Sequence, residues 1–61
     1  MNEYDIKRLG LILSVQAEIE GMKAENQARK PMGSLPFYNE IDFIKKAEEL
    51  RIIVYKHPEE L

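Results

Sequence analysis

The sequence predicts an all-α protein, a two-helix antiparallel hairpin that dimerises into a four-helix bundle. Apolar residues recur at helical spacings of three and four in two segments, residues 3–30 and residues 39–56. Two prolines and a glycine lie between them and exclude regular structure over residues 31–38. A connection this short predicts antiparallel helices within a single helical-hairpin domain over residues 1–61. We expect the tail, residues 57–61, to be frayed.

Length and composition limit what this chain can be. It has 61 residues, and a core of that size barely offsets the entropy lost on folding. There are no cysteines, so disulfides and thiolate metal sites are excluded, and the single histidine, His57, cannot hold a metal alone. We therefore expect no metal and no cofactor. Self-association is the remaining way for so small a chain to bury enough apolar surface, so the expected partner is a second copy of the chain.

The first helix, over residues 3–30, has start and stop signals at both ends. Asn2 is a good N-cap, and Asp5 stands where its carboxylate can reach back to the amide of Asn2. Met1 and Ile6 are spaced to pack against each other across that cap. Pro31 is expected to stop the helix. Acid–base pairs four residues apart, Glu3 with Lys7 and Glu25 with Arg29, are placed to add stability.

The second helix, over residues 39–56, opens with the same pattern. Asn39 is the predicted cap and Asp42 its reciprocal partner, and Pro58 follows the expected end. The β-branched and aromatic run at residues 52–55 is also compatible with a strand, but no partner strand is evident. We predict that the two helices pack through an intrachain core. Its residues are Ile12, Val15, Ile19, Met22, Phe43, Ala47, Leu50 and Val54.

The first half of the first helix is apolar on nearly every side, more than one neighbouring helix can cover. The residues left without an intrachain partner form the predicted oligomer interface, which consists of Leu9, Gly10, Leu11, Leu13 and Gln16. Gln16 either fixes the register as a buried amide or merely flanks the apolar stripe. Gly21 indicates either a close helix crossing or a tolerated weak position.

Catalysis is not expected from this composition. Ser14 and Ser34 are the only hydroxyl nucleophiles besides the tyrosines, and His57 lies beside a proline near the tail. Glu18 and Glu20 lie about 200° apart on a helix, so they cannot share a metal site. The protein is predicted not to be an enzyme.

Nucleic acid and membranes are also poor candidates as partners. Basic and acidic residues number nine and eleven and are interspersed, giving a net charge of −2. The longest apolar run is too short for a membrane span, so a cytoplasmic protein is expected. The basic doublets at residues 7–8, 29–30 and 45–46 keep nucleic-acid binding by a dimer open.

Residues 17–27, followed by Phe43 and residues 46–51, resemble short uncharacterised helical proteins of bacterial and prophage genomes. The resemblance covers both helices and implies no activity and no site. The leading functional hypothesis is a non-enzymatic, oligomeric protein–protein interaction or regulatory module. The alternatives are a small nucleic-acid-binding regulator and a subunit that docks on a different protein.

Overall fold

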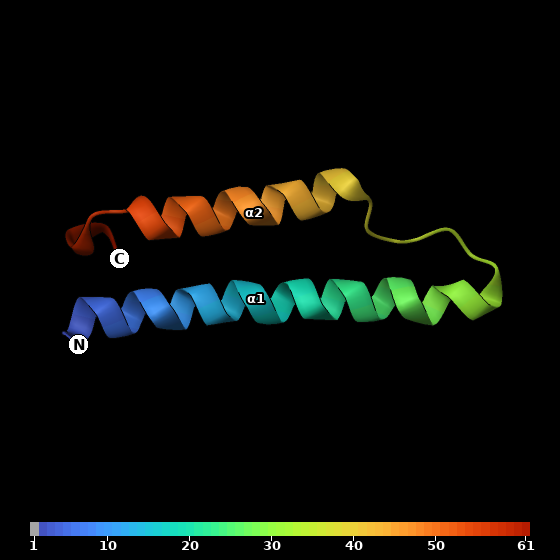
Figure 1. The fold of residues 1–61 in the computed structure, drawn as a ribbon, viewed down its shortest axis with the longest axis horizontal. Coiled ribbons are helices and arrows are strands. Elements are labelled where there is room, and N and C mark those ends of the chain that lie inside the picture. The colour runs from blue at the N-terminus through green and yellow to red at the C-terminus, as the bar shows by residue number, and fades with distance from the viewer. Residues whose placement is uncertain (1) are drawn as a thin grey trace.

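The computed structural model describes residues 2–61 as two antiparallel helices that lie side by side (Figure 1). Helix α1 spans Glu3–Arg29 and continues into a short 3₁₀ turn, η1, at Lys30–Met32. Helix α2 spans Glu40–Tyr55, and a second 3₁₀ turn, η2, follows at Pro58–Glu60. The described residues form no strand, so the run at residues 52–55 is helical. The predicted all-α hairpin is confirmed.

Both helices begin at their predicted caps. The Asn2 side chain accepts a hydrogen bond from the backbone amide of Asp5, at 2.9 Å. At the start of α2 both bonds of the predicted box are present: Asn39 Oδ1 accepts from the amide of Asp42 at 3.1 Å, and Asp42 Oδ2 accepts from the amide of Asn39 at 3.0 Å. These bonds satisfy amides that have no partner inside the helix. Met1, and with it the predicted packing of Met1 against Ile6, lies outside the described residues.

The ends of both helices differ slightly from the prediction. The α-helix stops at Arg29, but the chain turns on through η1, because a proline fits the first turn of a helix and fixes a suitable φ. Gly33, at φ 69°, ends that turn in the left-handed region. The tail, predicted to be frayed, forms a turn in the structure: Pro58 opens η2, the amide of Glu60 donates to the carbonyl of His57 at 2.9 Å, and Leu61 is half-buried.

The contact between the helices is a seam with coiled-coil spacing. On α1 the residues that face α2 recur at alternating steps of four and three, as in the a and d positions of a heptad. Val15 and Met22, with 4% and 6% of their surface exposed, are the only buried side chains among the described residues. The half-buried residues of the predicted core are Ile12, Ile19, Phe43, Ala47 and Leu50.

Val54 does not belong to this core, contrary to the prediction. It is 49% exposed, whereas Ile53 is half-buried. These neighbours lie about 100° apart on the helix, one on each side of the line through Leu50. Opposite this turn of α2 the seam position of α1 is Arg8, whose guanidinium binds backbone carbonyls of α2. A polar side chain therefore occupies the place where an apolar partner for Val54 was expected.

The hairpin is long and flat, measuring 47 × 18 × 11 Å. Its radius of gyration is 14.7 Å, against about 10.5 Å for a compact domain of the same length. The smallest dimension equals the diameter of one helix, about 10–12 Å with side chains. Both broad faces of the hairpin therefore meet solvent, and no third layer covers either of them.

Candidate interaction surface

A cationic side chain closes the seam at the end where the two termini meet. The Arg8 guanidinium donates to the carbonyls of Ile53, Val54 and Lys56, the last two at 3.2 and 2.7 Å. The last carbonyls of a helix have no intrahelical partner and carry the negative end of the helix dipole. Arg8 therefore caps α2 from α1. Sequence reasoning missed this role, although Arg8 lies four residues before Ile12 and so continues the spacing of the seam.

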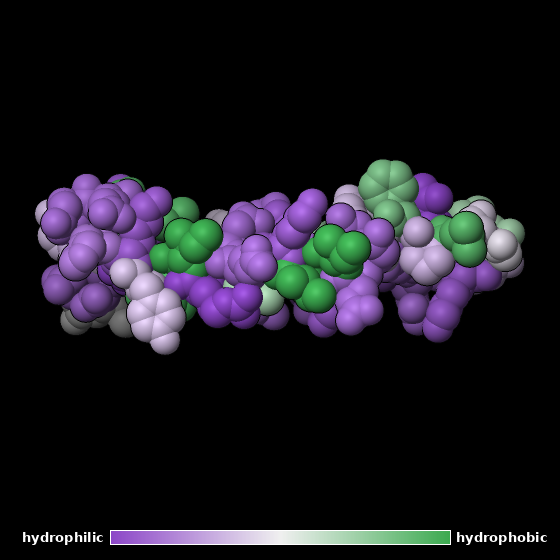
Figure 2. Space-filling view, turned by 90° about the horizontal axis from the view of Figure 1, so that it is seen from above, coloured by the Kyte–Doolittle hydropathy of each residue, from purple (hydrophilic) through white to green (hydrophobic). Residues whose placement is uncertain are grey.

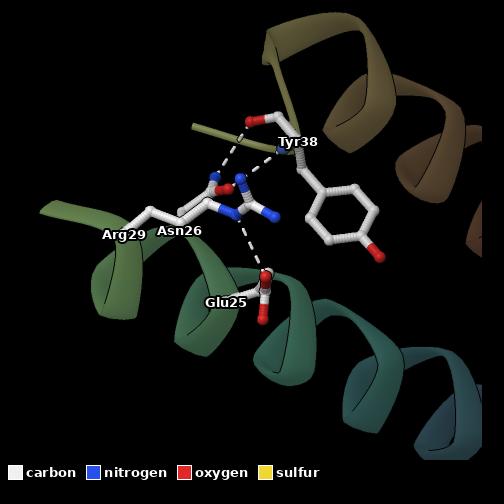
Figure 3. A network of polar contacts seen from close by, with 4 residues as sticks. All are labelled: Glu25, Asn26, Arg29 and Tyr38. Carbon is white, nitrogen blue, oxygen red and sulfur yellow. Dashed lines mark hydrogen bonds and ion pairs between the residues drawn. The ribbon is translucent and has the colours of Figure 1, made fainter. Parts of the chain in front are cut away.

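An amide closes the other end of the seam, where the connecting loop returns to α2 (Figure 3). Asn26 Nδ2 donates to the carbonyl of Tyr38 at 2.9 Å, and the amide of Tyr38 donates to Asn26 Oδ1 at 3.0 Å. Asn26 is half-buried, and both polar atoms of its side chain form a hydrogen bond with the backbone of Tyr38. The amide at this position therefore holds the loop against α1, a use that the sequence did not indicate.

Arg29 lies next to this pair, in contact with both an acid and an aromatic ring. Its Nε donates to Glu25 at 3.0 Å, the predicted pair four residues apart (Figure 3). Its guanidinium carbon stands 5.0 Å from the centre of the Phe37 ring, within the range of a cation–π contact. The other pair predicted in α1, Glu3 with Lys7, forms no ion pair among residues 2–61.

Lys46 connects the helices on one broad face of the hairpin. Its ammonium lies 2.8 Å from a carboxylate oxygen of Glu18 on α1 and 3.0 Å from one of Glu49 on α2. The hydrogen bonds to Glu18 and then to Glu49 raise the pKa of Lys46 above its ordinary value. Because these groups are exposed, the pairs orient the helices more than they stabilise them.

Two shallow hollows along the seam identify the two broad faces. One, of about 550 Å³, is lined by Phe43 of α2 and by Glu20, Lys23 and Gln27 of α1, among others. The other, of about 340 Å³, is lined by Lys46 of α2 and by Glu18, Gly21 and Met22 of α1, with Tyr38. We name these sides the Phe43 face and the Lys46 face.

Helical spacing assigns the rest of α1 to the same two faces. Steps of four and three lead back from the residues of the first hollow to the start of the helix. The Phe43 face therefore carries Leu9, Leu13, Gln16, Glu20, Lys23 and Gln27. The same steps on the other side give the Lys46 face, which carries Lys7, Leu11, Ser14, Glu18, Gly21 and Glu25. One face is apolar near the termini, and the other is charged along most of its length.

This assignment divides the predicted interface. Leu9, Leu13 and Gln16 share the Phe43 face, with Leu9 44% and Leu13 57% exposed. Leu11 falls on the Lys46 face, and Gly10 falls on the outer edge of α1, because successive residues turn by about 100° around a helix. Five residues spread over this arc cannot all contact one partner helix. Three of the five predicted residues, Leu9, Leu13 and Gln16, therefore remain on a single face.

The predicted close approach at Gly21 is absent. A Cβ built on Gly21, or on Gly10, meets no heavy atom within 4 Å apart from those of its own surroundings in the helix. Gly21 instead borders the hollow on the Lys46 face, where the Glu18–Lys46 pair links the two helices. The glycine is therefore a tolerated weak position within this chain.

Further apolar side chains remain exposed away from the two faces. In the connecting loop Met32, Leu35 and Phe37 are exposed and only Tyr38 is half-buried. The loop is pinned by Asn26 before these side chains can reach the seam. Seen over α2, the molecule is mostly hydrophilic with separate hydrophobic patches (Figure 2). Exposed isoleucines of α2 include Ile52.

Other features of the described residues add no further site. They contain no group of three or more histidine and carboxylate side chains placed to hold a metal. Neither described helix combines the length and hydrophobicity needed to cross a bilayer. No family model, curated protein or solved structure matches the chain. The candidate functional feature is thus the exposed apolar half of the Phe43 face.

Proposed function

We propose that this chain is a non-enzymatic protein–protein interaction module that acts as a self-associated pair of hairpins, a four-helix bundle. One observation carries the proposal: the hairpin is 11 Å thick, and of residues 2–61 it buries only Val15 and Met22. Every other apolar side chain of the described residues stays at least partly exposed on a hairpin this thin. A second layer of helices is the simplest source of the missing burial.

The exposed area supports a partner of the same size. The surface of the chain is 4879 Å², whereas a compact monomer of its mass exposes about 4,100 Å². The excess, about 750 Å², is close to the roughly 800 Å² that each partner buries in a stable complex of standard size. A cytoplasmic location is part of the proposal, and the cysteine-free composition is its support.

The contacts of the basic residues favour this function over nucleic-acid binding. Arg29 is engaged by Glu25 and by the Phe37 ring, and Lys46 is engaged by Glu18 and Glu49. Binding to phosphates would have to break these contacts, and binding strength depends on the number of free cationic groups. A duplex-binding regulator is therefore the less supported alternative.

The oligomeric mass in solution tests the proposal. Light scattering coupled to size-exclusion chromatography should give twice the chain mass of 7.2 kDa at micromolar concentration, with helical circular dichroism. A folded, stable species at the mass of one chain would contradict it. Adding labelled duplex DNA at low salt checks the alternative, which predicts a shift that is lost when Arg29 and Lys30 are both replaced by alanine.

A further inference from the structure

We infer that the second copy docks on the Phe43 face, over the half nearest the termini, and that the two hairpins run antiparallel with their loops at opposite ends. This inference rests on the proposed self-association and specifies its geometry. Three features carry it: the charge on each broad face, the position of the exposed apolar side chains, and the charges in the loop half of the Phe43 face.

The Lys46 face is a poor surface for burial. The Glu18–Lys46–Glu49 ion pairs lie across it, and Lys7 and Glu25 belong to its stripe on α1. Burying charged groups costs several kcal/mol per ion unless every one is well paired in the complex. On the Phe43 face, the stripe of α1 carries no charged residue between Asp5 and Glu20, and α2 adds one exposed charge, Arg51, which no ion pair of the described residues holds in place. The second copy should therefore contact this face.

The apolar surface of the Phe43 face is concentrated near the termini. Helical spacing assigns Leu9 and Leu13 of α1 and Val54 of α2 to this half of the face, and all three are at least 44% exposed. Val54 follows Phe43 and Leu50 on this side of α2 at helical spacing. Within one chain Arg8, rather than an apolar side chain, lies opposite Val54, so a second copy is left to cover it. The contact surface that we infer is centred on these three residues.

The loop half of the same face determines the relative direction. Glu20 and Lys23 form an exposed ion pair there, at 3.2 Å, with Gln27 beyond it. A parallel pair of hairpins would set each of these charges near the same charge of the second copy, which is destabilising. An antiparallel overlap of the terminal halves joins the apolar surfaces and leaves both loop halves in solvent. The favoured pair is therefore staggered and longer than one hairpin.

Nitroxide distances on single-cysteine variants test the geometry, since the chain has no cysteine of its own. Labels on Ser34→Cys in the loop should lie farther apart than the 47 Å length of one hairpin. Labels on Gln16→Cys, on the Phe43 face, should lie close together. The matched control Ser14→Cys carries its label on the Lys46 face, so two layers of 11 Å each should separate the labels.

The outcomes distinguish the inference from the proposed function. A dimer whose Ser34 labels are closer than 47 Å contradicts the antiparallel arrangement. A dimer whose Ser14 labels are closer than its Gln16 labels shows that the wrong face was chosen. In both cases self-association itself stands. If the unlabelled protein is a folded monomer, the proposed function fails as well.

A charge-swap experiment tests the surface without labels. Leu13→Lys should give the mass of one chain, whereas Ile52→Lys, a matched control at a 62% exposed site on α2, should remain dimeric. Mixing Leu13→Lys with Leu13→Glu should restore the dimer mass, because opposite charges then meet near the two-fold axis. A variant that merely fails to fold would not be rescued by mixing, so rescue shows that charge at the contact had broken the dimer. A Leu13→Lys variant that stays fully dimeric by itself would overturn the inference.

Discussion

At the scale of single residues, the least predictable contacts are those made by polar side chains in the seam. Arg8 and Asn26 occupy the positions that precede and follow the apolar core at the same alternating spacing. Read alone, that spacing predicts a place facing α2 but not what the side chain binds. Their partners are backbone groups of residues 38 and 53–56, and only the fold brings these within reach. No local sequence signal encodes such pairs.

Arg8 is expected to contribute measurably to stability. Replacement by alanine removes three hydrogen bonds to helix-end carbonyls, and hydrogen bonds involving a charged group are worth about 1.5–3 kcal/mol when buried. Since the side chain is only half-buried, we expect the free energy of unfolding to fall by about 1–2 kcal/mol. Urea unfolding followed by circular dichroism measures this change. Lys45→Ala, at an exposed site on the outer side of α2, is the control and should be near neutral.

The ion pairs of Lys46 predict a pH dependence at the alkaline end. Their hydrogen bonds raise the pKa of Lys46 above its ordinary value of 10.5 in the folded state. The folded state therefore holds the proton more tightly, and the stabilisation is complete below 10.5 and disappears as the pH rises through the folded pKa. The stability difference between the protein and Lys46→Met should be constant from pH 7 to 9 and vanish at higher pH. Lys45→Met, outside any ion pair of the described residues, is the control, and a difference that grows with pH would refute the assignment.

At the scale of whole elements, the sequence was a good guide because helix boundaries depend on neighbouring residues. The Asn–Asp caps and the prolines act within one turn, so both helices lie within about one residue of the prediction. Which residues face the partner helix depends on the position of α2 along α1, set by the loop and by Arg8. The choice between Ile53 and Val54 could not be read from α2 alone.

Gly21 gives a prediction about helix α1 as an element. A Cβ at this position meets nothing within 4 Å, so alanine fits without rearrangement. Glycine costs about 0.5–1 kcal/mol relative to alanine inside a helix, and Gly21→Ala should raise the free energy of unfolding by that amount. Gly10→Ala, equally open, is the matched comparison and should give a similar gain. Chemical denaturation of both variants measures these changes. A loss of stability in Gly21→Ala alone would show that Gly21 lies in close contact with another group.

At the scale of the whole molecule, flatness is the property that sequence reasoning anticipated only in part. Excess apolar residues on α1 indicated that a partner was needed, but the predicted interface spread around the helix because the direction of α2 was unknown. With α2 in place, Leu9 and Leu13 are separated from Leu11 by the seam itself. Two unequal faces result, one charged along most of its length and one apolar near the termini, and only the apolar half of the second suits a buried contact.

A hairpin that owes its stability to a second copy must become more stable as its concentration rises. For a dimer that unfolds to two chains, each tenfold increase in concentration adds about 1.4 kcal/mol and should raise the thermal midpoint by a few degrees. Thermal unfolding at three concentrations tenfold apart, followed by circular dichroism, measures this slope. Leu13→Lys should lower the midpoint or abolish the cooperative transition, while Ile52→Lys should retain the concentration dependence, because only the first site lies on the Phe43 face. A midpoint independent of concentration, at any value, would mean that the single hairpin is stable by itself.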